Sequence, residues 1–494
     1  MLCFVAVTLL FLDFTGTLHH WLGWMAKVQF MPAVLALNVA IVVALVVLTL
    51  VFGRIYCSVI CPLGVMQDLI SWVHGKRKKN RFTYSKEVKW LRYPMLVVFI
   101  AVLVAGFGAV CALLEPYSNF GIIATNLLQP IYQWCNNGIA AIAEHYNSYT
   151  FYTVDVWVKS VAALCTAAAL LLVIGYLAWR GGRTYCNTIC PVGTILSFLS
   201  RFSLLKIHID DDRCIKCGMC TRNCKSSCID YKNGKVDYSR CVTCGNCIEK
   251  CHKDAIYYGR PRKSSVESGD VDKPQEESID KGKRAFLIGS GIALTTTAMA
   301  QAKKKVDGGL AAIEDKKMPK RKSPITPPGS INARNMHQHC VACQLCVAEC
   351  PNQVLQPSSD LLTFMQPIMS YERGYCRPEC NRCSQVCPSG AIKPISLEEK
   401  SSTQIGHAVW THFLCIPTRN KNKDGKPISC GNCARHCPTG AITMIQLDEN
   451  DENSPMVPSV NEAKCIGCGA CEHVCPSRPV SAIHVEGHED HRTI

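Results

Sequence analysis

The chain has 494 residues, of which 48% are hydrophobic and 33 are cysteines, and it carries a formal net charge of +15. The apolar fraction excludes intrinsic disorder, and the length excludes a small disulfide scaffold, which replaces a missing core in short secreted chains. At about 150 residues per domain, the length predicts about three domains. The net charge is +11 over residues 1–259, +6 over 260–329 and −2 over 330–494, so the basic excess is not one continuous nucleic-acid surface.

Apolar segments at residues 1–14, 33–52, 94–114 and 160–179 dominate the beginning of the chain. Each of the last three holds about 20 residues, or roughly 30 Å as a helix, which matches the hydrocarbon core of a membrane. The first is short for a span, but we interpret it as the first transmembrane helix. We therefore predict an all-α transmembrane part with four helices in residues 1–205. Buried helices of a soluble protein are the alternative, and three such runs disfavour it.

Basic residues predict the orientation of this part. Residues 53–89 contain eight Lys or Arg, residues 15–32 contain one, and residues 115–155 contain none. Cytoplasmic loops carry the excess of positive charge. Residues 53–89, the N-terminus and the chain after residue 179 are thus predicted to be cytoplasmic, with 115–155 facing outward.

An internal repeat follows two of the predicted helices: GRIYCSVICPLG at residues 53–64 and GRTYCNTICPVG at 182–193. The C-x-x-x-C-P units carry Cys57, Cys61, Cys186 and Cys190. If the repeats meet, these thiols can form an additional metal or iron–sulfur site, or a redox dithiol pair. A Gly–Cys–Pro turn that seats an interfacial helix is the structural alternative, and the spacing does not choose between these roles.

Six cysteine motifs occupy the remainder of the chain. Four have the spacing C-x2-C-x2-C-x3-C: Cys214, Cys217, Cys220, Cys224; Cys241, Cys244, Cys247, Cys251; Cys340, Cys343, Cys346, Cys350; and Cys465, Cys468, Cys471, Cys475. Two are variants with a wider first gap: Cys376, Cys380, Cys383, Cys387; and Cys415, Cys430, Cys433, Cys437. Soft thiolates in this spacing suit [4Fe–4S] clusters, whereas structural zinc sites use paired knuckles. The sequence predicts six [4Fe–4S] clusters.

Crossed ligation is typical of such paired motifs, because the fourth cysteine of one motif binds the other cluster. In an α+β dicluster ferredoxin domain at residues 206–259 we therefore expect two ligand sets: Cys214, Cys217, Cys220 with Cys251, and Cys241, Cys244, Cys247 with Cys224. Cys228 is a spare thiol that either packs beside the cluster or competes with Cys224 as the ligand.

Residues 260–329 are predicted to be a linker, rich in charged residues, that contains the segment 282–302. Its Lys283-Arg284 pair resembles a twin-arginine export signal, and residues 298–300 form an A-x-A cleavage pattern. A fifth membrane helix or a tethered amphipathic segment is the alternative. The linker leads into a predicted α+β domain with four clusters at residues 330–487.

The sequence contains no motif that predicts haem or a nucleotide cofactor. The apolar segments contain no histidine pair for haem b, and neither C-x-x-C-H nor G-x-G-x-x-G occurs. We therefore expect no haem and no nucleotide cofactor. No residue set defines a quinone pocket, and Asp13, His19 and His20 near one predicted membrane face are the only suggestion of one.

Together these motifs resemble a fusion of two ferredoxin-type subunits. Residues 1–259, with two C-x-x-x-C-P and two ferredoxin motifs, resemble the membrane quinol dehydrogenase NapH. Residues 282–487, with the export-like signal, a PPG element at 327–329 and four ferredoxin motifs, resemble NapG. Methylamine-utilisation polyferredoxins and nitrous oxide reductase maturation proteins have similar layouts. The resemblance implies a multi-pass protein of the bacterial inner membrane, with the dicluster domain cytoplasmic and the four-cluster domain periplasmic.

The resemblance also implies a pairing within the four-cluster domain, in which the first motif exchanges its last cysteine with the fourth, and the second with the third. The implied sets are Cys340, Cys343, Cys346, Cys475; Cys465, Cys468, Cys471, Cys350; Cys376, Cys380, Cys383, Cys437; and Cys415, Cys430, Cys433, Cys387. The wide gap after Cys415 contains a basic loop, residues 419–426, that departs from the family.

Two functions follow as hypotheses. In the first, the protein relays electrons from quinol to an exported terminal reductase or its cytochrome donor, with quinol dehydrogenase activity of its own as an open question. In the second, it is a maturation or regulatory factor that donates electrons to a metalloenzyme and uses the C-x-x-x-C-P thiols. Nucleic acid is not an expected partner.

Overall fold

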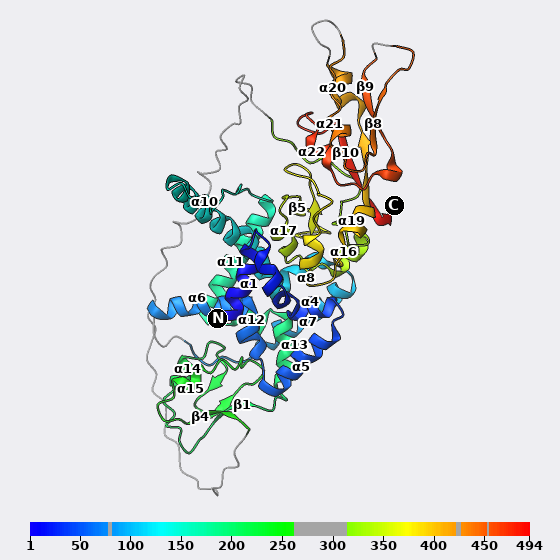
Figure 1. The fold of residues 1–494 in the computed structure, drawn as a ribbon. Coiled ribbons are helices and arrows are strands. Elements are labelled where there is room, and N and C mark those ends of the chain that lie inside the picture. Colours follow the sequence, from blue (N-terminus) through cyan, green and yellow to red (C-terminus); the bar gives the residue numbers. More distant parts are fainter. Residues whose placement is uncertain (78–81, 261–313, 421–425, 452–453) are drawn as a thin grey trace.

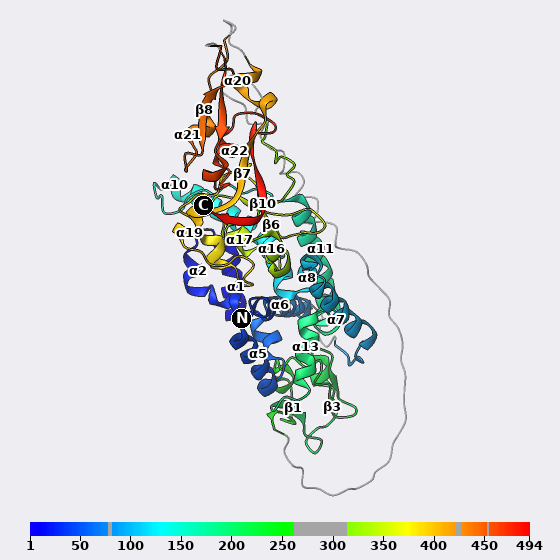
Figure 2. The same ribbon diagram turned by 90° about the vertical axis from the view of Figure 1, so that its right-hand side faces the viewer.

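The structure is a computed structural model that describes residues 1–77, 82–260, 314–420, 426–451 and 454–494. A helical part, residues 1–205, lies in the middle of the molecule (Figure 1). A small domain, residues 206–259, covers one end of it, and the domain that begins at residue 314 covers the other (Figures 1 and 2). We call these the dicluster domain and the C-terminal domain.

The helical part consists of many helices of unequal length. They are α1 (Leu2–Leu12), α2 (Thr17–Leu22), α3 (Trp24–Lys27), α4 (Phe30–Leu35), α5 (Val39–Phe52), α6 (Pro62–Arg77), α7 (Lys89–Val104), α8 (Gly108–Leu114), α9 (Pro116–Ile123), α10 (Gln129–His145), α11 (Val161–Gly181), α12 (Thr184–Thr188) and α13 (Pro191–Ser200). Two π-helical turns, Tyr56–Ile60 and Ala124–Leu128, interrupt them. Aromatic side chains of α1 and α9 form part of the core, where the Phe11 and Phe120 rings meet edge to face at 6.0 Å.

Among the described residues, α11 alone is long and apolar enough to cross a membrane, and α1, α5 and α13 are shorter apolar helices. The expectation of single helices over 33–52 and 94–114 is wrong. The first run breaks where Leu37 takes a φ of 53°, and the Asn38 side chain then caps α5 by accepting from the Ile41 amide at 3.3 Å. The second run breaks at Gly106, with a φ of 79°.

The dicluster domain is built from two antiparallel strand pairs and two short helices. β1 (Lys206–Ile209) pairs with β4 (Ile256–Gly259), and β2 (Ile229–Asp230) pairs with β3 (Lys235–Val236). Helices α14 (Met219–Arg222) and α15 (Asn246–Glu249) each begin inside a cysteine motif. This arrangement places the cysteines of each motif around the start of a helix.

The C-terminal domain is also α+β. Its strand pairs are β5 (Leu355–Pro357) with β6 (Pro367–Met369), β7 (Thr403–Trp410) with β10 (Ile483–Thr493), and β8 (Ile442–Gln446) with β9 (Met456–Val460). Its helices are α16 (Ala333–His339), α17 (Leu345–Glu349), α18 (Arg382–Val386), α19 (Leu397–Ser402), α20 (Ile416–Arg419), α21 (Asn432–Arg435) and α22 (Ala470–Val474).

Residues 314–329, predicted to belong to the linker, pack against this domain. The Lys316 ammonium group donates to the carbonyl oxygens of Glu472 and Cys475 at 2.6 and 3.0 Å. Arg321 forms a buried ion pair with Glu472 at 2.7 Å. The export-like segment 282–302 and the A-x-A pattern at 298–300 lie outside the described residues.

Candidate iron–sulfur sites

The four C-x-x-x-C-P cysteines are buried in the helical part, each with 3–4% of its surface exposed. Pro62 and Pro191 begin α6 and α13 directly after the second cysteine of each motif, because the fixed φ of proline suits the first helical position. A Cβ atom at Gly64 would overlap the Cys57 carbonyl oxygen, and one at Gly193 would overlap that of Cys186. In both repeats the glycine after the C-P pair thus packs closely against the carbonyl oxygen of the first cysteine.

The two repeats bring their thiols together. Burial raises the pKa of the Cys61 thiol, and the nearby Cys186 and Cys57 thiols raise it further. Burial likewise raises the pKa of Cys190, with further increases from Cys186, Cys61 and Cys57. We call these four residues the central site. Four buried thiols that influence one another's pKa would supply the ligands of an iron–sulfur centre, and the chemistry of these donors fits such a group.

Two fully buried arginines surround the central site, and sequence reasoning missed both. An Arg54 Nη lies 3.7 Å from Cys57 Sγ, and its guanidinium donates to the Cys186 carbonyl oxygen at 3.2 Å. Arg183 donates to the Cys57 carbonyl oxygen and forms an ion pair with Asp68 at 2.7 Å. Each arginine therefore links its own repeat to the other. The G-R pair at the start of both repeats was the available signal, since buried cations stabilise thiolate charge.

In the dicluster domain, Cys224 lies with the second motif, as crossed ligation requires. Burial raises the pKa of Cys247, and Cys241 and Cys224 raise it further. Cys228, only 1% exposed, has its Sγ 3.5 Å from Cys224 Sγ. The thiols of Cys228 and Cys224 therefore both lie close to the cysteines of the second motif. The place of Cys251 in the other set stays a prediction.

The C-terminal domain groups its cysteines differently from the implied pairing. Small cavities are lined by Cys350, Cys376, Cys380, Cys383, by Cys415, Cys430, Cys433, Cys475, and by Cys437, Cys465, Cys468, Cys471. Cys340, Cys343, Cys346 and Cys387 form the remaining group, because Cys340 and Cys387 both raise the pKa of the buried Cys343 and Cys346 thiols. We number the sets by the motif that supplies three cysteines, so Cys340 belongs to the first, Cys376 to the second, Cys415 to the third and Cys465 to the fourth.

Adjacent motifs thus exchange their fourth cysteines, and the implied exchange between first and fourth, and between second and third, is wrong. The physical reason is that α17 packs on α18, and α21 packs on α22, so that each pair of neighbouring motifs forms its own two-helix unit. Among the described residues, no three His, Cys, Asp or Glu side chains lie close enough together to hold a single metal ion. Four cysteines spaced around a cavity fit a cubane cluster better than zinc.

The four sets lie in series. Cys383 of the second set raises the pKa of Cys346 in the first, beyond the larger effect of burial. The Cys376 amide donates to the Cys468 carbonyl oxygen at 3.0 Å, which joins the second set to the fourth. Cys433 belongs to the third set and Cys437 to the fourth. They lie close together in the chain, on α21 and just after its end, and so connect these two sets. The order first, second, fourth, third leads away from the helical part (Figure 1).

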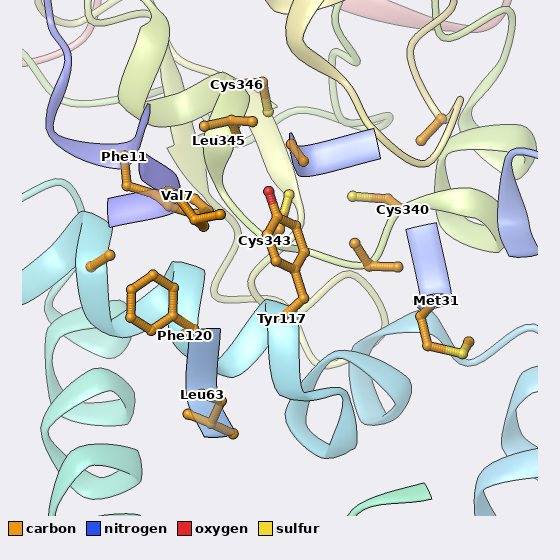
Figure 3. Close-up of a cluster of buried hydrophobic side chains, with 14 of the residues drawn as sticks. Val7, Phe11, Met31, Leu63, Tyr117, Phe120, Cys340, Cys343, Leu345 and Cys346 are labelled. Atoms are coloured by element: carbon orange, nitrogen blue, oxygen red, sulfur yellow. The ribbon is translucent and has the colours of Figure 1, made fainter. Parts of the chain in front are cut away.

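The first set rests directly on the helical part. Figure 3 shows Tyr117 of α9 beside Cys343, with Phe11 and Phe120 close by. Side chains from the end of α9 onward hold the C-terminal domain here: the Asn126 amide donates to Gln344 Oε1 at 2.7 Å, and the Gln129 amide donates to the Ala348 carbonyl oxygen at 3.2 Å.

Glu115 and Arg54 connect the central site to its neighbours on both sides. Glu115 lies near enough to Cys61 and Cys343 to raise the pKa of each, after the larger effect of burial. On the opposite side, Arg54 donates to the Ser239 carbonyl oxygen at 3.1 Å, two residues before Cys241. The central site therefore lies between the dicluster domain and the first set of the C-terminal domain.

Three regions of the chain match two known families. Residues 34–80 and 163–210 match the family described as “4Fe-4S binding domain”, and residues 428–478 match the “4Fe-4S dicluster domain”. The first match contains both C-x-x-x-C-P motifs and none of the ferredoxin motifs. The second contains most cysteines of the third and fourth sets.

Several curated proteins are distantly similar. The putative electron transport protein YccM of Escherichia coli K12 is 26% identical over 204 residues, 40% of this chain and 48% of that protein. The methylamine utilization ferredoxin-type protein MauN of Methylobacillus flagellatus is 28% identical over 174 residues, 35% of this chain and 48% of its own length. The ferredoxin-type protein NapF of E. coli is 27% identical over 90 residues, 18% of this chain and 52% of its own.

The chain therefore spans about half the length of the curated relatives it matches. It contains 4Fe–4S ferredoxin-type domains and is a distant homologue of electron-transport ferredoxin proteins. The specific NapH–NapG arrangement stays a prediction.

Proposed function

We propose that this protein is a membrane-bound [4Fe–4S] electron-transfer protein that relays electrons from the quinol pool to an exported terminal reductase or to its cytochrome donor. One observation carries the proposal. Cysteine sets suited to iron–sulfur clusters follow one another from the dicluster domain, through the central site, to the far end of the C-terminal domain. Hydrogen bonds, shared helices or the nearby Glu115 link neighbouring sets, which supports a continuous path.

Six [4Fe–4S] clusters would be held by the two sets of the dicluster domain and the four of the C-terminal domain, and the central site would hold a further centre. When bound, such clusters supply reversible one-electron transfer. The chain itself contributes burial, thiol ligands and positive charge, above all Arg54 and Arg183 at 0% exposure. Buried cations beside thiols favour the more negative, reduced state of a centre held there.

The arrangement of the two domains supports a position across a membrane. The dicluster domain contacts residues in or beside the basic segment 53–89: the Tyr258 hydroxyl donates to the Phe52 carbonyl oxygen at 2.9 Å, and Arg240 donates to the Ser85 hydroxyl. The C-terminal domain contacts the segment that lacks Lys and Arg, through Asn126 and Gln129. By the positive-inside rule, these are opposite sides of the membrane. We therefore place the dicluster domain in the cytoplasm and the C-terminal domain in the periplasm.

A maturation factor that works through the C-x-x-x-C-P thiols is the weaker alternative. Thiol–disulfide exchange requires a thiolate that a partner's sulfur can reach. The four thiols of the central site are 3–4% exposed and covered by both neighbouring domains. Their burial favours a resident redox centre over a thiol that reacts with a substrate.

Anaerobic purification with iron analysis and EPR tests the proposal. Six four-iron clusters predict about 24 iron atoms per chain, and a four-iron centre at the central site predicts about 28. Addition of a ubiquinol or menaquinol analogue is expected to produce the EPR signals of reduced clusters. Full iron loading with no response to either quinol would overturn the quinol relay and favour the maturation role.

Protease protection in oriented membrane vesicles tests the topology separately. Cleavage of the C-terminal domain is expected only from the periplasmic side. Cleavage from the cytoplasmic side would contradict the path across the membrane, even if quinol reduces the clusters.

A further inference from the structure

A large cavity lies where the helical part meets the C-terminal domain. Its volume is about 490 Å³. The start of α10 and the segment 152–159 form its walls on one side, and residues 347–355, at the end of α17 and after it, form the other. It is far larger than the cavities lined by four cysteines, of 10–30 Å³. A cavity of several hundred Å³ is of the size that binds a small molecule.

Polar groups are held at one wall of this cavity by contacts between the two parts. The half-buried Lys159 ammonium group donates to Gln129 Oε1 at 2.6 Å, and the Gln129 amide donates to the Ala348 carbonyl oxygen at 3.2 Å. Because the Lys159 nitrogen has at least two hydrogens in either protonation state, it can donate to a ligand while it holds Gln129. Asp155, also on the lining, pairs with Arg373 at 3.5 Å.

Aromatic and aliphatic side chains supply the other surfaces. Trp134, Tyr152 and Trp157 line the cavity. The Tyr152 ring packs edge to face on Phe14 at 5.8 Å, and the Arg373 guanidinium lies 4.9 Å from the Trp157 ring centre. Flat aromatic walls with a few fixed donors suit a planar ring that carries two oxygens. Ile131, Trp134 and Val158 are more than half exposed, which leaves an apolar surface for an isoprenoid tail.

The cavity lies against a redox site. Cys350 lines both this cavity and the small cavity of the second set. Val347 and Ala348, also on the lining, belong to the helix that carries Cys346 of the first set. A molecule in the cavity would therefore adjoin two cysteine sets. Each [4Fe–4S] cluster takes one electron, whereas quinol oxidation releases two, so two adjacent sets meet the requirement.

We propose that this cavity is the quinol-binding site of the protein. The inference rests on the proposed quinol relay and names where it occurs. A quinol head group lies between the aromatic walls with one oxygen bound by Lys159. Its oxidation would break two O–H bonds, pass one electron to each of the two [4Fe–4S] clusters that the adjacent cysteine sets would hold, and release two protons to water past the exposed Asp155 carboxylate. The product is the quinone.

Binding rather than turnover gives the most direct test. The full-length wild-type protein is photolabelled with an azido-quinone, and labelled peptides are mapped by mass spectrometry. Labels are expected in residues 129–134, 152–159 or 347–355. Affinity for a decyl-quinone is measured by quenching of tryptophan fluorescence in wild type, Lys159→Met and Trp134→Ala. Trp21→Ala is the matched control, because Trp21 is 76% exposed and lies away from the cavity lining.

The Lys159→Met variant is expected to bind the quinone about 10-fold more weakly, because it loses a hydrogen-bond donor to a quinone oxygen. Trp134→Ala is expected to weaken binding several-fold, and Trp21→Ala to leave it unchanged. Labels elsewhere, with unchanged affinity in both cavity variants, would overturn this location. If quinol still reduces the wild-type clusters in that case, the relay stands and only the site fails. If wild-type protein neither binds quinone nor is reduced by quinol, both proposals fail. A lipid that quinone cannot displace from the cavity would also overturn the assignment.

Discussion

The helical part meets its two iron–sulfur domains through different chemistry. Toward the dicluster domain, buried arginines join backbone carbonyls of both parts, as Arg54 and Arg92 do at the Ser239 carbonyl oxygen, 3.1 and 3.3 Å away. Toward the C-terminal domain, the buried contacts are made by neutral amides and a tyrosine, the ion pair of Asp155 with Arg373 is exposed, and the cavity of about 490 Å³ remains between the parts. The charged junction encloses its thiols completely, while the neutral junction leaves space for a ligand. One helical scaffold thus carries a closed electron path and an open binding site.

Loss of Arg183 is expected to have the largest effect at the charged junction. Its removal leaves Asp68 buried without its arginine partner and should lower the free energy of unfolding by about 3–5 kcal/mol. Arg183→Met is compared with Arg180→Met in chemical denaturation in detergent, because Arg180 is exposed near the same helix end. Equal stability of the two variants would contradict a structural role for the buried ion pair.

Cysteine variants test the assignment of sets next to the neutral junction. Cys387→Ser should remove the same EPR and redox signal as Cys340→Ser, since both cysteines belong to the first set. Cys415→Ser should remove a different signal. If Cys387→Ser instead matches Cys415→Ser, the pairing implied by the NapG resemblance is correct and the grouping in the structure is not.

A smaller effect is expected from a substitution in α9, where this helix lies close to the first set. A Cβ atom at Gly121 would overlap the Cys343 carbonyl oxygen, so Gly121→Ala should weaken the junction by about 1–3 kcal/mol. Gly138→Ala is the control, because no atom lies within 4 Å of the added methyl group there. Hydrogen exchange of residues 341–346 is the measurement, and faster exchange is expected only in Gly121→Ala. Equal exchange in both variants would show that the junction adapts.

The smallest effect is expected from Thr243→Ala in the dicluster domain. The Thr243 hydroxyl donates to the Phe52 carbonyl oxygen at 3.3 Å in an exposed position. Its loss should change stability by about 1 kcal/mol or less, because several arginine contacts hold the same junction. A loss as large as that of Arg183→Met, measured in the same denaturation experiment, would show that the arginines do not dominate the contact.

Sequence spacing predicted the local chemistry better than the long-range arrangement. The repeated motif and the position of Cys224 were predicted from residues close in the chain, and the structure places these thiols near their expected partners, while cluster binding there stays a prediction. The exchange of Cys350 and Cys387 depends on which short helices pack together, and spacing alone does not determine that. A family resemblance supplied the wrong pairing.

The helix breaks and the large cavity also could not be predicted from the sequence. Leu37 is a residue that ordinarily favours helices, so its positive φ reflects tertiary packing and not local preference. The polar residues of the cavity, Gln129 and Lys159, come from a segment that hydropathy describes only as an outward loop. Only the structure shows that they line a cavity, because it places them beside residues 347–355, more than 180 positions later in the chain.

The most direct test of the electron path is freeze-quench EPR after addition of quinol to wild type and Cys57→Ser, with Cys135→Ser as a control at an exposed cysteine. We predict that quinol reduces the clusters of both domains in wild type and in the control. In Cys57→Ser, the clusters of the C-terminal domain should still be reduced, while those of the dicluster domain should not. Equally fast reduction of the dicluster domain in Cys57→Ser and wild type would contradict a path through the central site.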